Sequence, residues 1–497
     1  MFSRIISEDH ISPLCIVLVG AMGSIGDNQY RLHQPAAALA ELDNIHVYEV
    51  HPQARYHDAA VLAADLVVFT MTLDIEIFRL IHQRQQLLRP SICEINDYLP
   101  DVQVCNPAYS SWSDWRALHC FYQLLKRCDA AQVSTVALQF RLQEHAQRIE
   151  VFPNQLVDLP SPRFDADEFI ATSDSPLVVG WGGSYGHLED LYSIAAPLIQ
   201  FLNQHENVRF ELMGDPQFEV LFSSLPAHKF CFYPAGSLAN YLSWLDHLHI
   251  GIAPLLPTDY NRCRSDVKFL EYASHSVAPL LQDLDPYHYL ADSKAALLFS
   301  NNSEFIDQLT LLLDNTSLRR IIATNAYNFV AKNRILASHV PDRLAFYKQL
   351  VAQEIKCSQQ PIPLLKLAGE QTLHSLPGMQ RLSAKHWRLG LDSEAEQQRS
   401  YGIELFQHNR IAEAANSFKQ TLLIDPTDAE ARCFLGYCFQ KQGLLQDAIN
   451  AFEEASVVDP LFSRPVRALA RLYRNLGTHY YERATLLNPI NNIGKPK

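Results

Sequence analysis

The sequence predicts two α/β domains with doubly wound parallel sheets, followed by an all-α repeat module. Three observations lead to this prediction. Short apolar runs alternate with helical patterns up to about residue 160, the same alternation resumes after residue 176, and a 34-residue period governs the end of the chain. Alternation of strands and helices is typical of parallel sheets covered by helices on both faces, and a fixed period indicates stacked repeats.

The composition is that of a globular protein with a large core. The 497 residues include 48% hydrophobic and 19% charged side chains, and the net charge is −13. This balance excludes a disordered chain and disfavours a general nucleic-acid binder, which needs a basic surface. We therefore expect no nucleic-acid partner.

We expect neither a transmembrane segment nor a signal peptide. The chain's best apolar run, Leu14 to Val19, is far shorter than the roughly 18–20 residues that span a bilayer, and Glu8 and Asp9 precede it. The ten cysteines are scattered without a CxxC pair, which favours a reducing compartment. The expected location is cytoplasmic, with peripheral attachment to the inner face of a membrane left open.

The first domain is predicted over residues 1–160. Its expected strands are 14–19, 45–50, 64–70, 91–95, 131–134 and 149–152. The first strand ends in a glycine-rich turn, Gly20 to Gly26, and a helical stretch follows over 34–42. The same turn continues into Tyr30 and Arg31, which would line one wall of a cleft.

The second domain is predicted over residues 161–345, after a Pro-Ser-Pro stretch at 160–162. A helix is expected at 188–202, and the expected strands are 177–181, 208–213, 230–233, 249–253, 278–281 and 296–299. Two doubly wound domains predict a ligand cleft beyond the carboxyl ends of their strands. Residues 346–392 show no recognisable fold pattern and are assigned as a linker.

The last region, residues 393–489, is a repeat. Gly402 and Gly436, Ala414 and Ala448, Phe418 and Phe452, and Pro426 and Pro460 are each 34 residues apart. We place two repeats at 393–426 and 427–460, and a shortened third at 461–489. This pattern resembles the tetratricopeptide repeat, which implies a surface for a protein partner or for self-association.

The segment from Tyr260 to Tyr272 carries the best candidate ligand-binding residues. Ser265 is a good N-cap, so we expect a helix to begin there. Arg264 and Lys268 would add to the positive N-terminus of this helix, which suits a diphosphate. Glu271 shares a face with Lys268 and would accept hydrogen bonds from two vicinal hydroxyls, as on a ribose. The same spacing also fits an exposed helix with a Lys–Glu pair.

A second candidate is the small-residue loop that follows strand 177–181. Gly182, Gly183 and Ser184 precede a helix, and glycines let backbone N–H groups approach phosphate oxygens. His187, at the start of that helix, would donate to a phosphate. A purely structural turn has the same pattern.

The sequence gives weaker support for a metal site or for a hydrolase. Asp283-Leu284-Asp285 and Asp165-Ala166-Asp167 match a three-residue metal-binding pattern that recurs by chance in acidic chains, and His247 and His249 have no carboxylate or cysteine cluster beside them. Ser134 has no nucleophile-elbow glycines. We expect neither a metal site nor another cofactor.

Taken in order, these motifs resemble a retaining glycosyltransferase of family four, the group 1 type with the GT-B fold, over about residues 12–345. The motifs that carry the resemblance are the Gly20 loop with Tyr30-Arg31 and Gln34-Pro35, Glu94-Ile95-Asn96-Asp97, Val133-Ser134-Thr135, Pro153-Asn154, Gly182 through Asp190, and Ser265 through Tyr272.

The resemblance implies transfer of a sugar from a nucleotide diphosphate donor, with retention and without a required metal. It makes Glu271, Lys268 and Arg264 catalytic, and Gly182, Gly183, Ser184, His187, Ser265 and Asp266 donor-binding. It places Gly23, Tyr30, Arg31 and Asp97 on the acceptor side. The acceptor would be a glycan, a lipid-linked glycan or a protein.

The chain departs from the family pattern at four positions. The first glutamate of the family's E-x7-E motif falls at Cys263, and the usual basic residues of the phosphate loop fall near Trp181 and His187. The glycine often found after the helix is replaced near Ser276. Two alternatives therefore stay open. One is a protein O-glycosyltransferase whose repeats present a polypeptide, and the other is a non-catalytic scaffold.

Overall fold

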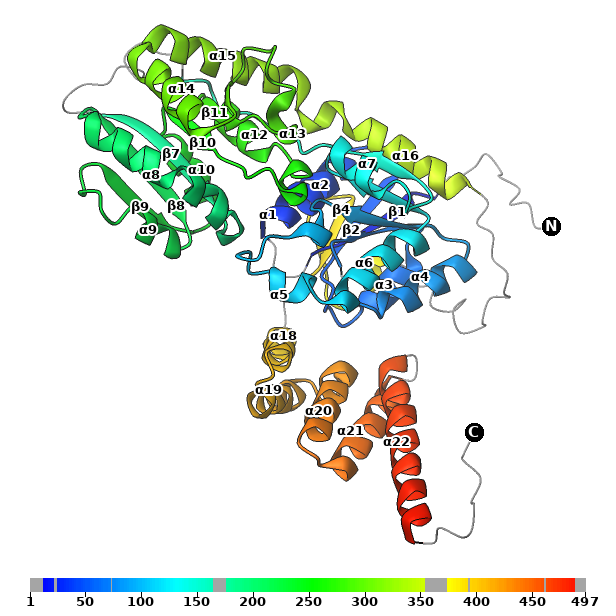
Figure 1. Cartoon of the computed structure of the whole chain (residues 1–497). Coiled ribbons are helices and arrows are strands. Elements are labelled where there is room, and N and C mark those ends of the chain that lie inside the picture. The colour runs from blue at the N-terminus through cyan, green and yellow to red at the C-terminus, as the bar shows by residue number, and fades with distance from the viewer. Residues whose placement is uncertain are drawn as a thin grey trace. The chain divides into compact units, whose positions relative to one another are not determined.

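The computed structural model describes residues 12–21, 25–72, 74–163, 176–353, 373–391, 394–459 and 462–487 (Figure 1). The chain divides into two compact units. One comprises residues up to Glu49, Ala59–Leu373 and Arg381–Trp387, and the other comprises Val50–Asp58, His374–Gln380 and the chain from Arg388 onward. The first unit contains two α/β lobes and the second contains the repeat helices.

The first lobe is built on an eight-stranded sheet in the order β13-β14-β2-β1-β3-β4-β5-β6. Its first six strands are β1 (Leu14–Val19), β2 (Ile45–Val50), β3 (Leu66–Thr70), β4 (Ser91–Ile95), β5 (Ala130–Val133) and β6 (Ile149–Val151). The ladder from β1 through β3, β4 and β5 to β6 is parallel. These strands lie where the apolar runs predicted them, because a strand covered on both faces must be apolar throughout.

Helices cover both faces of this sheet. They are α1 (Ile25–Asn28), α2 (Gln34–Ala40), α3 (His57–Ala63), α4 (Ile77–Gln86), α5 (Tyr109–Trp112), α6 (Trp115–Arg127) and α7 (Val136–Leu142). A π-helical turn, Gln29–His33, joins α1 to α2. A late helix, α16 (Val340–Ala352), also packs here: Leu344 and Tyr347 belong to the core of this lobe, and the Tyr347 hydroxyl donates to Gln132. The chain thus returns to the first lobe after completing the second.

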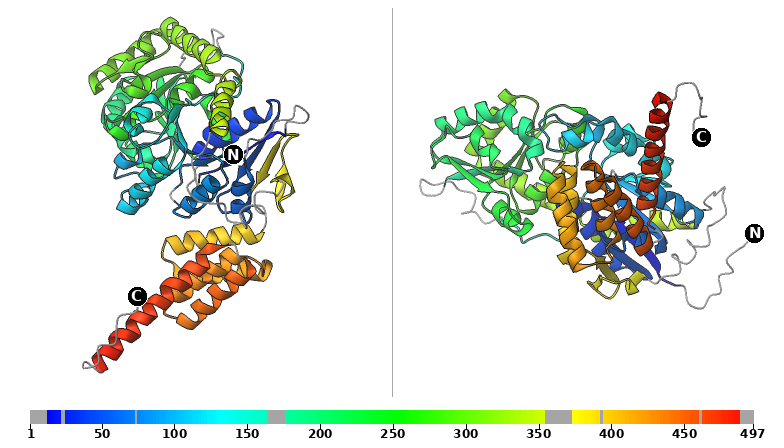
Figure 2. Two further views of the ribbon diagram at one scale, coloured as in Figure 1. Left: turned by 90° about the vertical axis from the view of Figure 1, so that its right-hand side faces the viewer. Right: turned by 90° about the horizontal axis from the view of Figure 1, so that it is seen from below.

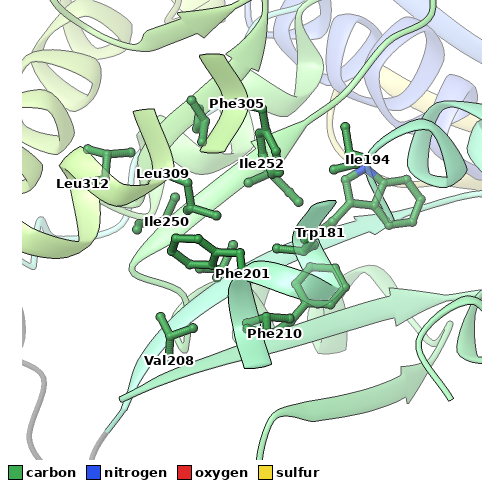
Figure 3. Close-up of a cluster of buried hydrophobic side chains, with 14 of the residues drawn as sticks. Trp181, Ile194, Phe201, Val208, Phe210, Ile250, Ile252, Phe305, Leu309 and Leu312 are labelled. Atoms are coloured by element: carbon green, nitrogen blue, oxygen red, sulfur yellow. The ribbon is translucent and has the colours of Figure 1, made fainter. Parts of the chain in front are cut away.

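The second lobe has a six-stranded sheet in the order β12-β11-β10-β7-β8-β9. The strands are β7 (Leu177–Gly183), β8 (Val208–Gly214), β9 (Phe230–Pro234), β10 (Ile250–Ala253), β11 (Ala278–Gln282) and β12 (Leu297–Phe299), all parallel. The helices are α8 (Leu188–Gln204), α9 (Gln217–Leu221), α10 (Leu238–Leu245), α11 (Asp259–Arg262), α12 (Val267–Ser274), α13 (Asp285–His288), α14 (Asn302–Asp314) and α15 (Thr316–Asn333). Figure 3 shows the core in which Trp181, Phe201 and Phe210 pack with residues of α14.

Two short strands in the segment assigned as a linker were missed by the sequence analysis. β13 (Met379–Arg381) and β14 (His386–Leu389) extend the first sheet beyond β2. Trp387 stacks on Tyr48 with ring centroids 5.0 Å apart, and His386 hydrogen-bonds Glu49 at 2.8 Å. Strands of three and four residues with polar interruptions carry no clear period-2 pattern, so the sequence could not reveal them.

The second unit contains five helices among the described residues: α18 (Glu394–Gln407), α19 (Ile411–Ile424), α20 (Ala429–Lys441), α21 (Leu445–Val458) and α22 (Ser463–Leu487). The 34-residue pairs have a packing cause. A Cβ on Gly402 would lie 2.7 Å from the Phe418 ring, and one on Gly436 would lie 2.7 Å from Phe452. The two helices of each repeat touch at these glycines.

The expected third repeat is wrong as a helix pair. The first helices of repeats one and two end where Asn409 and Gly443 adopt positive φ values of 59° and 79°. Gly477, the next position in the period, instead lies inside α22, which runs unbroken for 25 residues (Figure 2). The shortened sequence therefore forms one long helix. Among the described residues, no helix combines the length and the hydropathy needed to cross a bilayer.

Candidate functional site

The candidate site lies at the topological switch point of the second sheet. β7 and β10 are neighbours, but the chain leaves β7 toward β8 and β9 and leaves β10 toward β11 and β12. Ligands of open α/β sheets bind in the crevice at such a point, beyond the carboxyl ends of the strands. β7 runs two residues beyond the predicted strand, so Gly182 and Gly183 form its carboxyl end and the loop starts at Ser184. α11 and α12 follow β10, so the fold brings the two predicted motifs to one place.

Gly182 is required by close packing. A Cβ at this position would lie 2.8 Å from both Tyr241 and Trp244 of α10. The Tyr241 hydroxyl accepts a hydrogen bond from Lys268 at 2.7 Å. The glycine loop and α12 are thereby joined through a residue that the sequence analysis did not single out.

Glu271 is the centre of a hydrogen-bonded cluster that spans the two lobes. Its Oε2 accepts from the Tyr241 hydroxyl at 2.7 Å and from Lys268 Nζ at 2.8 Å, and its Oε1 accepts from the Tyr30 hydroxyl of the first lobe at 3.2 Å. Burial, and then the negative charge of Glu271, raise the pKa values of Tyr30 and Tyr241, so both hydroxyls stay protonated. Glu271 therefore contacts the first lobe through Tyr30, and Lys268 is bonded to Glu271 and Tyr241 within the second lobe.

Arg264 joins the two motifs by a second route. Its Nη1 lies 2.6 Å from His187 Nε2, and His187 Nδ1 lies 3.0 Å from the buried carboxylate of Asp190. Burial and the positive charge of Arg264 lower the pKa of His187 to about 4. The imidazole is thus neutral at pH 7, with Nδ1–H donating to Asp190 and Nε2 accepting from Arg264. The expectation that His187 donates to a phosphate is corrected: it holds Arg264 in place.

The residues around the α12 N-terminus also differ from the prediction. The helix begins at Val267, with Asp266 rather than Ser265 at the N-cap position, and no side chain caps it. The Asp266 carboxylate instead pairs with Arg334 at 2.5 and 2.8 Å, and the Ser265 hydroxyl accepts from Asn154 at 3.0 Å. The ion pair of Asp266 with Arg334 and the hydrogen bond of Ser265 with Asn154 therefore take the place of the side-chain cap that the sequence predicted for α12.

Asp97 enters the site from the first lobe. Its carboxylate accepts a 3.3 Å hydrogen bond from the Tyr260 hydroxyl, and the Arg264 guanidinium lies 4.6 Å from the Tyr260 ring centre. Burial raises the pKa of Asp97 to about 6, although the Arg264 charge acts in the opposite direction. This carboxyl therefore titrates close to neutral pH, beside the predicted diphosphate-binding arginine.

Arg31 does not reach the site. It is buried and bonds Glu94 at 2.6 Å, the Phe152 carbonyl at 2.6 Å and the Asn154 side chain at 2.9 Å. The predicted ligand contact is wrong for this residue, because its guanidinium already bonds a carboxylate, a backbone carbonyl and an amide of the protein. Arg31 nevertheless acts on the site indirectly, because the Asn154 side chain that it bonds donates a hydrogen bond to the Ser265 hydroxyl. The side chain of Ser184 is exposed, and Gly23 lies outside the described residues.

The residues considered for a metal have other partners. Asp283 pairs with His288 and Asp285 with Arg262, each at 2.7 Å. His249 accepts from the backbone N–H of Val178, and His247 lies 3.7 Å from Glu211. Asp165 and Asp167 lie outside the described residues.

Several site residues escaped the sequence analysis. Tyr241 and Arg334 come from separate elements and match no spacing rule that links them to α12. Asn154 and Tyr260 were quoted only as members of motifs, without a role of their own. Asn106 of the first lobe is a further case, since its side chain lies 2.7 Å from a Cβ built on Gly186. Contacts of this kind depend on how the lobes meet, which no local pattern encodes.

Comparison with known proteins supports the fold. A tetratricopeptide-repeat family model matches residues 405–472, and no curated protein sequence matches the chain. The sucrose-phosphate synthase of Thermosynechococcus elongatus superimposes with a TM-score of 0.53 at 14% identity, over 68% of this chain and 99% of that one. Anabaena HepE, solved with UDP and glucose, has a TM-score of 0.49 at 13% identity, over 68% and 99% of the chains.

A glycosyltransferase from Rickettsia africae has a TM-score of 0.47 at 10% identity, over 69% of this chain and all of that one. The first of the three likenesses, together with the two switch-point sheets, establishes the GT-B fold, and the family model establishes a tetratricopeptide module. The predicted fold class is therefore confirmed.

Proposed function

We propose that this protein is a glycosyltransferase that moves a sugar from a nucleotide diphosphate donor to a glycan, lipid-linked or protein acceptor. The observation that carries the proposal is the convergence of Arg264, Lys268 and Glu271 at the switch point of the second sheet, against Tyr30 of the first lobe. The GT-B fold and the order of motifs that resembles family four support retention of configuration at the anomeric carbon.

The two cations suit the leaving group. When the sugar–phosphate bond breaks, negative charge develops on the diphosphate, and donors already in place stabilise that charge without reorganisation. Lys268 now bonds Glu271 and the Tyr241 hydroxyl, and Arg264 bonds the neutral His187. In the proposed mechanism both cations turn part of this hydrogen bonding toward the diphosphate oxygens. They supply the charge that a metal would otherwise provide, so we propose no metal requirement.

Glu271 would hold the nucleoside. Its carboxylate accepts two hydroxyl hydrogen bonds, from Tyr30 and Tyr241, at 3.2 and 2.7 Å. A ribose presents two neighbouring hydroxyls of the same chemistry, so it can replace the tyrosine that comes from the opposite lobe. Exchange of Tyr30 for ribose would couple donor binding to movement of the lobes, and closure would keep water from the activated sugar.

The first lobe would receive the acceptor. Asp97, with its pKa near 6, is a hydrogen-bonding partner for an acceptor hydroxyl at neutral pH. The repeat module adds a surface that could bind a protein. If the acceptor is a polypeptide, the proposed enzyme is a protein O-glycosyltransferase.

The test measures donor binding and donor hydrolysis by the full chain with UDP-, GDP- and ADP-sugars, in EDTA and in Mg²⁺. Lys268→Ala and Glu271→Gln are the informative variants. Loss of one preorganised donor to a developing charge typically lowers turnover by roughly 10²–10³-fold, and we expect that range for Lys268→Ala. Lys332→Ala is the matched control, because this cation is exposed and lies on α15, outside the cluster.

Two results would overturn the proposal. If no nucleotide shifts the melting temperature and no donor is consumed, the chain is a scaffold built on a transferase fold. If Lys268→Ala turns over donor as fast as Lys332→Ala, the site is not where we place it. Equal turnover in EDTA and in Mg²⁺ is expected, and loss of activity in EDTA would contradict the metal-free mechanism.

A further inference from the structure

The proposed mechanism leaves one buried carboxylate of the second lobe without a role. Asp190 lies in the first turn of α8 and is fully buried. Burial acts to raise its pKa, but the hydrogen bond from His187 and the other groups around it lower the pKa below its ordinary value. The carboxylate is therefore ionised at neutral pH. A buried charge is costly unless donors satisfy it, so the donors around Asp190 indicate its role.

The hydrogen-bond partners of Asp190 that the structure describes are all donors. Oδ1 accepts from the backbone N–H of Leu256 at 2.9 Å and from the Asn261 side-chain amide at 2.7 Å. The same amide also donates to the Leu256 carbonyl at 3.0 Å, which fixes its NH2 group toward Asp190. Gln103 of the first lobe donates a longer bond of 3.4 Å to Oδ1, and Oδ2 lies 3.0 Å from His187 Nδ1.

This set of contacts selects the tautomer of His187. An ionised carboxylate has no proton to donate, so the hydrogen of the neutral imidazole must be on Nδ1, and Nε2 is left as an acceptor. Nε2 lies 2.6 Å from Nη1 of Arg264, a group that can only donate. The other tautomer would direct an N–H group at the guanidinium.

Asparagine has the same shape as aspartate but cannot satisfy these contacts. If its oxygen stays on Leu256 and Asn261, its NH2 group faces His187 Nδ1 and the imidazole proton must move to Nε2. If the amide turns around, its NH2 group faces the N–H of Leu256 and the NH2 of Asn261. Both of these donors are fixed, whereas an imidazole can move its proton, so we expect the first arrangement.

We propose that Asp190 is a positioning residue for Arg264, because it holds His187 in the tautomer that accepts a hydrogen bond from the guanidinium. The inference rests on the proposed function, in which Arg264 binds the diphosphate. With Asp190 ionised, the guanidinium is held between His187 and the Tyr260 ring, 4.6 Å from the ring centre, before a ligand arrives. A donor that is already in place needs no reorganisation when the diphosphate binds.

The first test is the affinity of the full chain for UDP, GDP and ADP, measured by isothermal titration calorimetry. Asp190→Asn should weaken binding by about 10- to 100-fold, the range for losing a hydrogen bond to a charged group. Adding Asp190→Asn to Arg264→Ala should change the affinity by less than about two-fold, because residues that act through one contact are not additive. Asp246→Asn is the matched control and should bind as wild type. It alters a second Asp–His pair, with His275 at 2.9 Å, that lies before the amino end of β10.

The second test reads the tautomer itself. With ¹⁵N-labelled histidine, the His187 signals are assigned by their absence from the spectrum of His187→Gln. We expect Nε2 to carry no proton in the wild type and to carry one in Asp190→Asn, a change that a merely structural carboxylate would not cause. A glutamine can turn its carbonyl oxygen to Arg264 whatever faces it. In the His187→Gln background, Asp190→Asn should therefore change nucleotide affinity by less than about two-fold.

The outcomes separate this inference from the proposed function. If no nucleotide binds the wild type, the proposed function fails, and the tautomer measurement still decides whether Asp190 controls His187. If the wild type binds a nucleotide and Asp190→Asn binds it equally well, or if the losses of Asp190→Asn and Arg264→Ala multiply, Asp190 does not position Arg264. Circular dichroism shows whether Asp190→Asn folds. If it does not fold, a proton on Nε2 of His187 in the wild type overturns the proposal, and its absence there supports it.

Discussion

The two α/β lobes both have a parallel sheet with a switch point, although their strand orders differ, and they use buried arginines and lysines differently. In the first lobe, Arg31 is bound by Glu94, a backbone carbonyl and Asn154, and Arg84 by the carbonyls of Ala64 and Pro90. In the second lobe, Arg264 bonds the neutral His187, whereas Lys268 bonds both the Tyr241 hydroxyl and the Glu271 carboxylate.

The difference distinguishes Arg31 and Arg84 from Arg264, which we propose binds the diphosphate. A guanidinium saturated by a carboxylate and carbonyls belongs to the framework, because releasing it leaves buried acceptors without donors. A cation held by an imidazole or a hydroxyl can exchange that partner for a phosphate at small cost. Arg31 and Arg264 both follow a strand near a switch point, yet only the partners of Arg264 are of this exchangeable kind.

The largest effect that separates the lobes is expected for Arg31→Met. Removing one partner of a buried ion pair leaves Glu94 uncompensated, so the free energy of unfolding should fall by about 3–5 kcal/mol. Urea denaturation of the full chain, followed by fluorescence, measures this change. Arg262→Ala is the control, since its exposed pair with Asp285 contributes about 1 kcal/mol or less. If Arg31→Met loses nucleotide binding at unchanged stability, Arg31 is a ligand residue after all.

A smaller effect is expected for Gly182→Ala. The added methyl group would lie 2.8 Å from Tyr241 and Trp244, so the rings must move, at a cost of about 1–3 kcal/mol. Because Tyr241 bonds both Lys268 and Glu271, donor affinity should fall together with stability. Gly26→Ala is the control, as a Cβ there meets nothing within 4 Å. A Gly182→Ala protein with unchanged donor affinity would separate the glycine loop from the site.

The sequence predicted the two sheets well because their strands are buried on both faces. Each of the six apolar runs assigned to the second domain overlaps a strand, and the runs at 14–19, 45–50 and 91–95 match β1, β2 and β4 residue for residue. The same rule fails for β13 and β14, which are too short and too polar to show a period. The apolar pattern of a buried strand is visible in its own sequence, whereas the formation of a short edge strand depends on the strand with which it pairs.

The candidate site was predictable only in part. The helix-face spacing of Lys268 and Glu271 is a local property, and the structure places both in one cluster. The fate of Arg31, the role of His187 and the capping of α12 depended on residues more than 60 positions away, among them Glu94, Arg264 and Arg334. An arginine in sequence carries the same charge whether it serves a ligand or a carboxylate, and only the fold decides between them.

A pH effect of modest size is expected from the first lobe's contribution to the site. Because the pKa of Asp97 is about 6 in the folded chain and 3.8 is its ordinary value, the folded state binds this proton more tightly. The stability that protonated Asp97 contributes should therefore be lost as the pH rises from about 4 to about 6. Asp97→Asn removes this step, so the melting-temperature difference between pH 4.5 and pH 7 should shrink relative to wild type. An identical pH profile for the two proteins would contradict the assignment.

The smallest expected effect concerns Ser265, which forms a hydrogen bond between two uncharged side chains with Asn154 of the first lobe. A serine that caps a helix typically contributes about 1 kcal/mol, and Ser237 does cap α10 by accepting from the backbone N–H of Asn240. Ser265 instead accepts from Asn154 across the elements, while α12 has no side-chain cap. Ser265→Ala should therefore destabilise the chain less than Ser237→Ala in urea denaturation, yet weaken donor binding more. A larger stability loss at Ser265 would restore it as the cap, and the free N–H groups at the start of α12 would no longer be available to a diphosphate.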